Sequence, residues 1–157
     1  MRLRRTPVPD AVKAVPERRL AWGVTGDGVV LVATPTSLHV DGRALPWTSV
    51  ERVSWAAPLL RLTEIADVEG AGAVHLWELA QDHGLAETVR ERVTGSVAWS
   101  DVRSLSPAGS VRLVGRRVPG EDLLLWQVVW REGTDPGDPF LRAQVDAQVE
   151  ALRRTIG

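Results

Sequence analysis

Turn-forming residues recur along most of this chain and leave room only for short strands between them. Asp-Gly pairs stand at 27–28 and 41–42, and segments rich in Gly or Pro follow at 69–72 and 106–109. Asp-Gly is typical of tight β-hairpins because both residues tolerate positive φ. Short runs rich in Val, Leu and Trp lie between these turns. The pattern therefore predicts many short antiparallel strands joined by hairpins.

The expected strands are residues 20–24, 29–33, 37–40, 50–56, 59–65, 74–79, 96–105, 111–117 and 123–130. Two segments have a helical period instead. In the segment 85–93 apolar residues are spaced by four, and Asp138-Pro139 supplies a helix cap and a first helical residue before 139–156. The apolar stripe of the second helix is Leu141, Val145, Val149, Leu152 and Ile156. We therefore expect an α+β fold that is mainly antiparallel β.

The order of strands followed by a helix occurs twice, and this predicts two lobes. Residues 1–18, with three prolines, are expected to form an extended or short-turn N-terminal extension. Residues 19–95 form the first lobe, and residues 96–157 form a second lobe of three meandering strands and a C-terminal helix. Because no flexible linker separates the lobes, we expect them to share a core and form one compact unit.

Composition excludes several classes of protein. The chain has 157 residues, a hydrophobic content of 44% and no cysteine, so it can bury a core without disulfides or thiolate metal sites. Its net charge of −1 disfavours nucleic-acid binding, which needs a basic surface. The N-terminal segment lacks the apolar stretch of a secretory signal, so we expect a cytoplasmic protein. Of the nineteen basic residues, eighteen are arginine and only Lys13 is lysine. This bias suggests GC-rich codons and a bacterial source.

No motif for catalysis or cofactor binding is present. The sequence lacks Gly-x-Ser-x-Gly, His-Glu-x-x-His and the phosphate-binding Gly-x-x-x-x-Gly-Lys. The spacing of His39, His75 and His83 does not match a metal site, so we expect no metal and no cofactor. Arg116 and Arg117, adjacent on one strand, should point to opposite faces and lie in solvent. Enzyme activity is therefore not expected.

The segments 29–34, 38–40, 45–53 and 85–93 occur in an order that resembles bacterial pleckstrin-homology-like domains of the PH or GRAM type. The resemblance covers roughly residues 19–95. It implies a partly open barrel of bent antiparallel sheets with a helix, and binding of a peptide, a protein or a lipid headgroup. The first hairpin loop, Thr25–Gly28, carries an acid and no cation, so phosphoinositide binding and membrane insertion are not expected.

Seven tryptophans against one Phe and no Tyr are the most unusual feature of the composition. Most should provide core volume, but Trp47 beside a proline and Trp99 in a polar strand are expected to be partly exposed. Leu123 and Leu125 lie on a strand that is apolar on both faces, so one face must be covered by the first lobe or another subunit. These four residues are the candidate interface.

The sequence favours a noncatalytic binding or scaffolding module for a protein or peptide partner, with self-association as a homodimer as one form of it. The alternative is a small-ligand-binding or substrate-processing protein, whose pocket would be built by residues from different strands.

Overall fold

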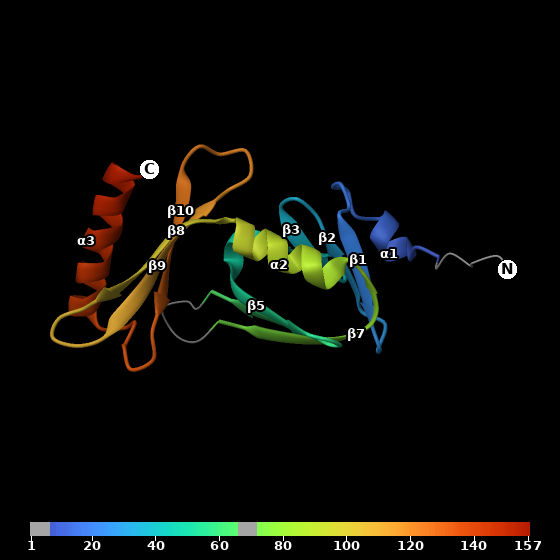
Figure 1. Cartoon of the computed structure of the whole chain (residues 1–157), viewed down its shortest axis with the longest axis horizontal. Coiled ribbons are helices and arrows are strands. Elements are labelled where there is room, and N and C mark those ends of the chain that lie inside the picture. The colour runs from blue at the N-terminus through green and yellow to red at the C-terminus, as the bar shows by residue number, and fades with distance from the viewer. Residues whose placement is uncertain (1–6, 66–71) are drawn as a thin grey trace.

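The short strands between the turns form one curled antiparallel sheet in the first lobe (Figure 1). The computed structural model describes residues 7–65 and 72–157. The seven strands lie in the order β4-β3-β2-β1-β7-β6-β5. Their bounds are β1 (Ala21–Thr25), β2 (Val30–Ala33), β3 (Ser37–Val40), β4 (Arg43–Pro46), β5 (Val50–Ala56), β6 (Leu59–Glu64) and β7 (Val74–His83). A 3₁₀ turn, η1 (Trp47–Ser49), joins β4 to β5.

Strand β7 holds the two halves of this curled sheet together. Its first half pairs with β6, and its second half pairs with β1. The register between β1 and β7 shifts between Val24 and Thr25. Such a bulge bends a strand and increases the local twist, so the sheet curls into a half-barrel. β7 runs to His83, beyond the expected end at residue 79.

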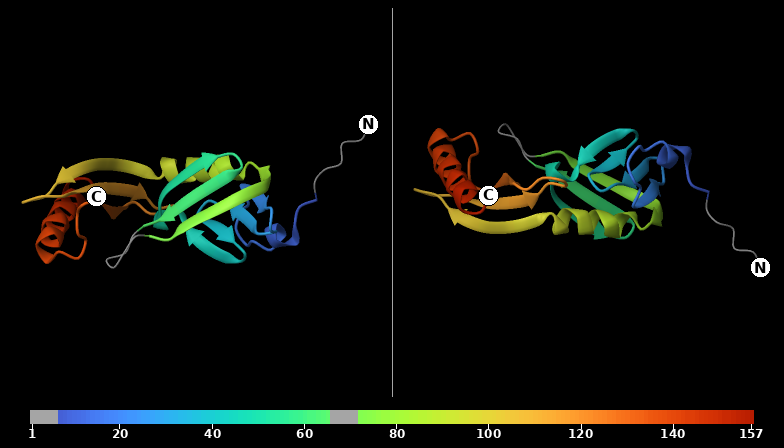
Figure 2. Two further views of the ribbon diagram at one scale, coloured as in Figure 1. Left: turned by 90° about the horizontal axis from the view of Figure 1, so that it is seen from below. Right: turned by 90° about the horizontal axis from the view of Figure 1, so that it is seen from above.

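Helix α2 (Leu85–Gly95) lies against the concave side of the half-barrel (Figure 2). Leu85, Val89 and Val93 are at most 5% exposed and belong to the core of the first lobe. The fourfold spacing seen in the sequence is therefore the buried face of the helix. The carboxylate of Asp82 accepts the backbone N–H of Leu85 at 2.7 Å and so supports the first turn.

The second lobe consists of a three-stranded sheet covered on one face by a helix. Its strands are β8 (Val97–Ser104), β9 (Ser110–Arg117) and β10 (Leu124–Trp130), in the order β10-β9-β8, and the helix is α3 (Pro139–Thr155). Asp138 caps α3 by accepting the N–H of Phe140 at 2.9 Å. This confirms the expected α+β fold: a curled sheet with a short helix, then three strands and a C-terminal helix.

Three local expectations were wrong or incomplete. Residues 10–13 form a short helix, α1 (Asp10–Lys13), where an extended or short-turn lead-in was expected, because Val12 is buried against β2. Strand β4 was not expected, and the end of the helical stripe, Ile156, is 43% exposed. Residues 1–6 of the expected extension and 69–71 of the expected turn lie outside the described residues.

Each lobe has a hydrophobic core of its own, where a shared core was expected. The first cluster gathers side chains from β1–β3, β5–β7, η1 and α2. The second gathers side chains from β9, β10 and α3 together with Leu105 after β8, and Trp99 of β8 packs against it. The two clusters have no residue in common, so the lobes meet at a junction that is not a continuation of either core. The molecule is elongated, with α1 at one end and α3 at the other (Figure 1).

Candidate binding site at the junction of the lobes

A buried arginine joins the two lobes. Arg116 on β9 is 3% exposed. Its Nη1 donates to the carbonyl of Val93 at 2.9 Å and to Oγ of Ser96 at 2.6 Å. Its Nη2 donates to the carbonyl of Glu51 at 3.2 Å, and its Nε donates to Oε1 of Gln127 at 2.6 Å. One guanidinium therefore contacts β5, the end of α2, the start of the second lobe and β10.

Gln127 completes this junction, because its amide Nε2 donates to the carbonyl of Thr48 in η1. Removal from water lowers the pKa of Arg116, and the charge of the nearby Arg112 lowers it further. A guanidinium nevertheless stays protonated in proteins. Its charge is stabilised here by four oxygen acceptors and not by a carboxylate, so the acceptors have to be well placed.

Arg116 and Arg117 point to opposite faces of β9, as alternation predicted, but the expectation that Arg116 lies in solvent was wrong. Arg117 is exposed, as expected, whereas Arg116 lies beneath the first lobe. One signal was present in the sequence. Gln127 interrupts the otherwise apolar run of β10, and a buried amide in such a run needs a polar partner.

A groove opens beside this buried arginine, between β5 and the face of the second sheet that α3 does not cover. Its volume is about 360 Å³. We call it the junction groove, and its lining residues are Glu51, Arg52, Val53, Val93, Thr94, Val97, Arg112, Val114, Arg116, Val129 and Arg131. Valines from both lobes form much of its wall, and four of its five charged residues are arginines.

Three of these arginines are exposed: Arg52 from β5, Arg112 from β9 and Arg131 directly after β10. Within the described ranges 7–65 and 72–157, none of the three forms an ion pair with a carboxylate. Arg112 donates from Nε to Oγ of Ser100 at 2.8 Å, which holds its guanidinium beside the groove. The groove is therefore a local basic site on a protein whose net charge is −1.

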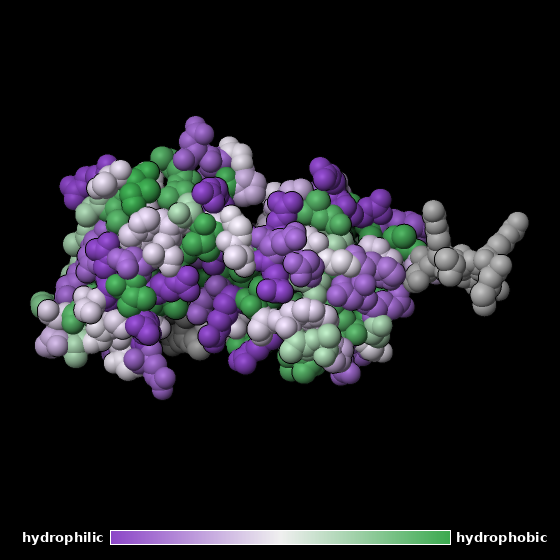
Figure 3. Space-filling view, viewed as in Figure 1, coloured by the Kyte–Doolittle hydropathy of each residue, from purple (hydrophilic) through white to green (hydrophobic). Residues whose placement is uncertain are grey.

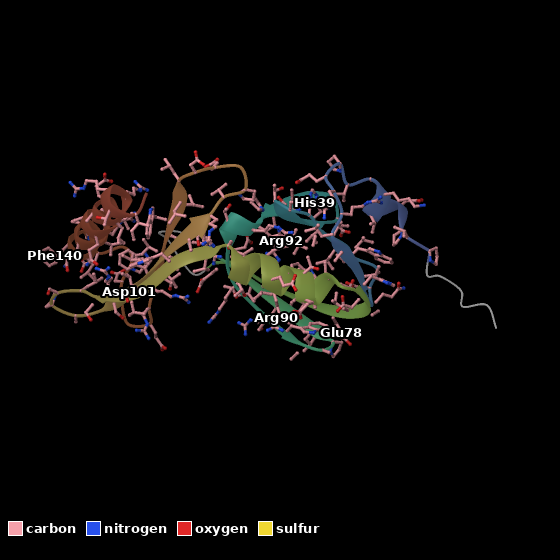
Figure 4. The ribbon with its side chains drawn as sticks, turned by 45° about the horizontal axis from the view of Figure 1, so that its top comes forward. His39, Glu78, Arg90, Arg92, Asp101 and Phe140 are labelled. Carbon is pink, nitrogen blue, oxygen red and sulfur yellow. The ribbon has the colours of Figure 1, made fainter. Side chains whose placement is uncertain are left out.

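A second, larger cleft of about 650 Å³ opens on the other side of the junction. Arg117 and Leu124, which line it, lie on the opposite sheet face from Arg112 and Arg116, because side chains alternate along a strand. Its charges are mixed: Glu91, Glu121, Asp122, Arg92 and Arg117. Arg92 at its edge belongs to α2 (Figure 4). With three acidic residues and two arginines, this cleft lacks the basic excess of the junction groove.

The four candidate interface residues do not come together. Trp47 is 3% exposed, so the expectation that it is partly exposed was wrong; its indole Nε1 donates to the carbonyl of Thr34 at 2.8 Å. Trp99 is half-buried against Trp126, with Arg103 over its ring. These two tryptophans belong to different lobes.

Of the other two candidates, Leu123 directly precedes β10 and Leu125 is its second residue. Leu123 is 68% exposed and Leu125 is 40% exposed. Gln127, two residues further along the same face as Leu125, is covered by the first lobe. One end of this strand face is therefore covered by the first lobe and the other end is open. Figure 3 shows apolar and polar surface interspersed over both lobes, without one dominant apolar area on this side.

The histidines have separate partners. His75 Nε2 lies 2.8 Å from Glu64, His83 stacks on Trp22, and His39, labelled in Figure 4, lies 3.7 Å from Glu17. Among the residues that the structure describes, no group of three or more His, Asp or Glu side chains lies close enough to hold a metal ion. In the first hairpin loop, Thr25 donates to the carboxylate of Asp27.

Comparison with known proteins gives no relative: no protein-family model, no curated protein and no solved structure matches this chain. No helix in the described part of the chain is both long and apolar enough to cross a membrane.

Proposed function

We propose that this chain is a noncatalytic binding module, and that its junction groove takes an acidic, extended segment of a partner protein. The observation that carries the proposal is the set of three exposed arginines around a valine-lined groove. Arginine forks bind carboxylates through paired hydrogen bonds, and apolar walls accept the aliphatic side chains that stand between acidic residues.

The position of the groove supports a peptide more than a compact ligand. Arg52 comes from the first lobe, whereas Arg112 and Arg131 come from the second. A ligand that contacts all three has to span both lobes. An extended chain segment does so with side chains that alternate between charge and apolar contact.

We also propose that the first lobe is a pleckstrin-homology-like domain. The seven-stranded antiparallel half-barrel with α2 against its concave side agrees with the architecture that this resemblance implies. The first hairpin loop contains Asp27 and no cation, which supports a ligand other than a phosphoinositide.

The test is a fluorescence-anisotropy titration of the full chain with labelled peptides in which Glu or Asp alternates with Val or Leu. The expected result is saturable binding that weakens with salt, because exposed ion pairs are screened. Arg112→Glu and Arg131→Glu should each weaken binding about tenfold or more, since each replaces an attraction by a repulsion.

Arg154→Glu is the matched control, because Arg154 is exposed at the end of α3 and lies outside the groove lining. It changes net charge by the same amount and should leave the affinity unchanged. Equal losses in all three variants would mean that the peptide follows overall charge, and no binding of any acidic peptide would refute the proposal.

The alternative of a small-ligand-binding protein is favoured by the larger cleft, whose volume is within the range of ligand pockets. A thermal-shift screen of metabolites on the wild type tests it. A hit would have to be lost in Arg117→Glu, which alters the cleft, and retained in Arg112→Glu, which alters the junction groove.

A further inference from the structure

Strand β8 is an edge strand with a free backbone. It pairs only with β9 in the second sheet. The N–H of Leu105 donates to the carbonyl of Gly109 and closes the hairpin between them. Since hydrogen-bonding direction alternates along an antiparallel pair, the backbone groups of residues 101 and 103 point to β9. Those of residues 100, 102 and 104 point to the free edge.

The hydrogen bonds of this edge agree with the alternation. The N–H of Val102 donates to the carboxylate of its own neighbour, Asp101, at 2.9 Å. A backbone N–H that belonged to the β9 ladder would not be free to do this. Val102 itself is 48% exposed, which is unusual for an apolar side chain at the centre of a strand. The middle of the edge is therefore accessible in both backbone and side chain.

The side chains along this edge are complementary to themselves. Residues 100–104 read Ser-Asp-Val-Arg-Ser. If a second copy pairs antiparallel about Val102, each Ser100 stands opposite a Ser104, and each Asp101 stands opposite an Arg103. The two valines face each other at the centre. Only this register places an acid opposite a base on both sides of the centre.

The charges are already arranged for this pairing. Arg103 Nε lies 2.9 Å from Asp101 Oδ2 in the single chain, with the two side chains 36% and 52% exposed. In the pair, each carboxylate would contact the guanidinium of its own chain and the one opposite. Four charges of alternating sign would then surround the two-fold axis. Opposite charges directly across an antiparallel pair stabilise it, and like charges destabilise it.

The other edges of the two sheets lack this feature. β4 is short and ends in Pro46, which is typical of an edge protected from pairing. On β5 the carbonyl of Glu51 is already occupied by Arg116. β10 has no charged residue between Leu124 and Trp130, so no charge pattern on it selects a partner or a register.

We propose that two copies of this chain associate through β8, and that the paired sheets form one continuous antiparallel sheet. The Val102 pair exchanges both backbone hydrogen bonds, and each Ser100–Ser104 pair does the same. On association, the carboxylate of Asp101 releases the N–H of Val102 and forms an ion pair with Arg103 of the second copy. β8 lies along the margin of the second lobe, in line with α2, where the first lobe does not cover it (Figure 2).

Sedimentation equilibrium of the full chain over a range of concentrations tests the proposal. The wild type should form a dimer. Asp101→Arg and Arg103→Asp should each weaken dimerisation at least about tenfold, because each puts like charges opposite one another. An equimolar mixture of the two variants should form a heterodimer, since Arg at 101 then faces Asp at 103. The double variant D101R/R103D should dimerise with itself.

A backbone variant separates strand pairing from charge. Val102→Pro removes only an N–H that points to the free edge, so it should abolish the dimer and keep the far-ultraviolet circular dichroism of the wild type. Leu125→Asp, on another strand, should leave the dimer intact.

A wild type that stays monomeric at millimolar concentration would overturn the proposal. So would a dimer that survives both Asp101→Arg and Val102→Pro, or a dimer that is lost in Leu125→Asp. Failure of the mixed variants to associate would overturn the proposed register.

Discussion

Arg116 is the residue on which the arrangement of the lobes depends most directly. Burying a guanidinium removes it from water, and the cost falls only where acceptors replace the lost hydration. The acceptors come from both lobes: Glu51 and Val93 belong to the first, and Ser96 and Gln127 to the second. The lobes cannot separate or rotate far without breaking these bonds, so a single polar side chain restricts their relative orientation.

Replacing Arg116 by Met should therefore lower the free energy of unfolding of the second lobe by about 2–4 kcal/mol, because hydrogen bonds to a charged group are lost and buried oxygens are left unpaired. Urea titration monitored by tryptophan fluorescence measures the change. Arg117→Met is the control. It lies next in sequence but is exposed, so it should change stability by no more than about 0.5 kcal/mol. Equal effects would contradict the role assigned to Arg116.

The sequence indicated part of this chemistry and missed the rest for a physical reason. Alternation along β9 was enough to separate Arg116 from Arg117. The burial of Arg116 could not be predicted in the same way, because the residue that covers it, Glu51, lies 65 residues earlier in the chain. The junction groove was missed for the same reason, since Arg52, Arg112 and Arg131 meet only in the folded chain. Trp47 was expected to be partly exposed because it follows Pro46, but a neighbouring proline does not determine burial.

At the scale of elements, turn chemistry and periodicity predicted most strands and both longer helices. β3, β5 and the core of α2 were found because hairpin turns and a fourfold apolar spacing are local signals. β4 was missed although the Asp41-Gly42 turn precedes it, because it is only four residues long, ends in Pro46 and lacks β-branched residues. α1 was missed because its four residues carry no helical period. α1 is stabilised by the contact of Val12 with the sheet, which is a tertiary effect.

Helix α3 provides a test of which part of its apolar stripe is buried. Val145 is 1% exposed, whereas Ile156 is 43% exposed. Val145→Asp places an unpaired charge between helix and sheet and should lower the free energy of unfolding by about 3 kcal/mol or more. Ile156→Asp should lower it by about 1 kcal/mol or less. Thermal melts followed by circular dichroism compare the two, and similar losses would mean that the whole stripe is packed.

At the scale of the molecule, two separate cores are joined by a polar contact. The core of the first lobe contains no residue beyond Val93, and that of the second contains none before Trp99. Intervening polar groups such as Arg116 and Gln127 favour a fixed orientation more than they favour stability. The clefts on both sides of this contact have the same origin, because two lobes that meet only over a small contact leave open space beside it.

This design predicts that the first lobe folds alone. A chain that ends at Gly95 keeps all the strands of the half-barrel, helix α2 and every member of the first core. The carbonyls of Glu51 and Val93, which Arg116 contacts in the whole protein, would then be solvated by water, so their loss of a partner costs little. The truncated chain should therefore unfold cooperatively, with disperse amide signals in its NMR spectrum.

The second lobe should be the less stable of the two. It is small, with three strands and one helix, and a domain of that size has little stability to spare. In the whole protein it should unfold at lower urea concentration than the first lobe, which gives two transitions by fluorescence, since tryptophans lie in both cores. Arg116→Met should move the two transitions further apart because it removes the contact that couples them. A single transition in both proteins, together with a disordered truncated chain, would mean that the two cores fold as one unit.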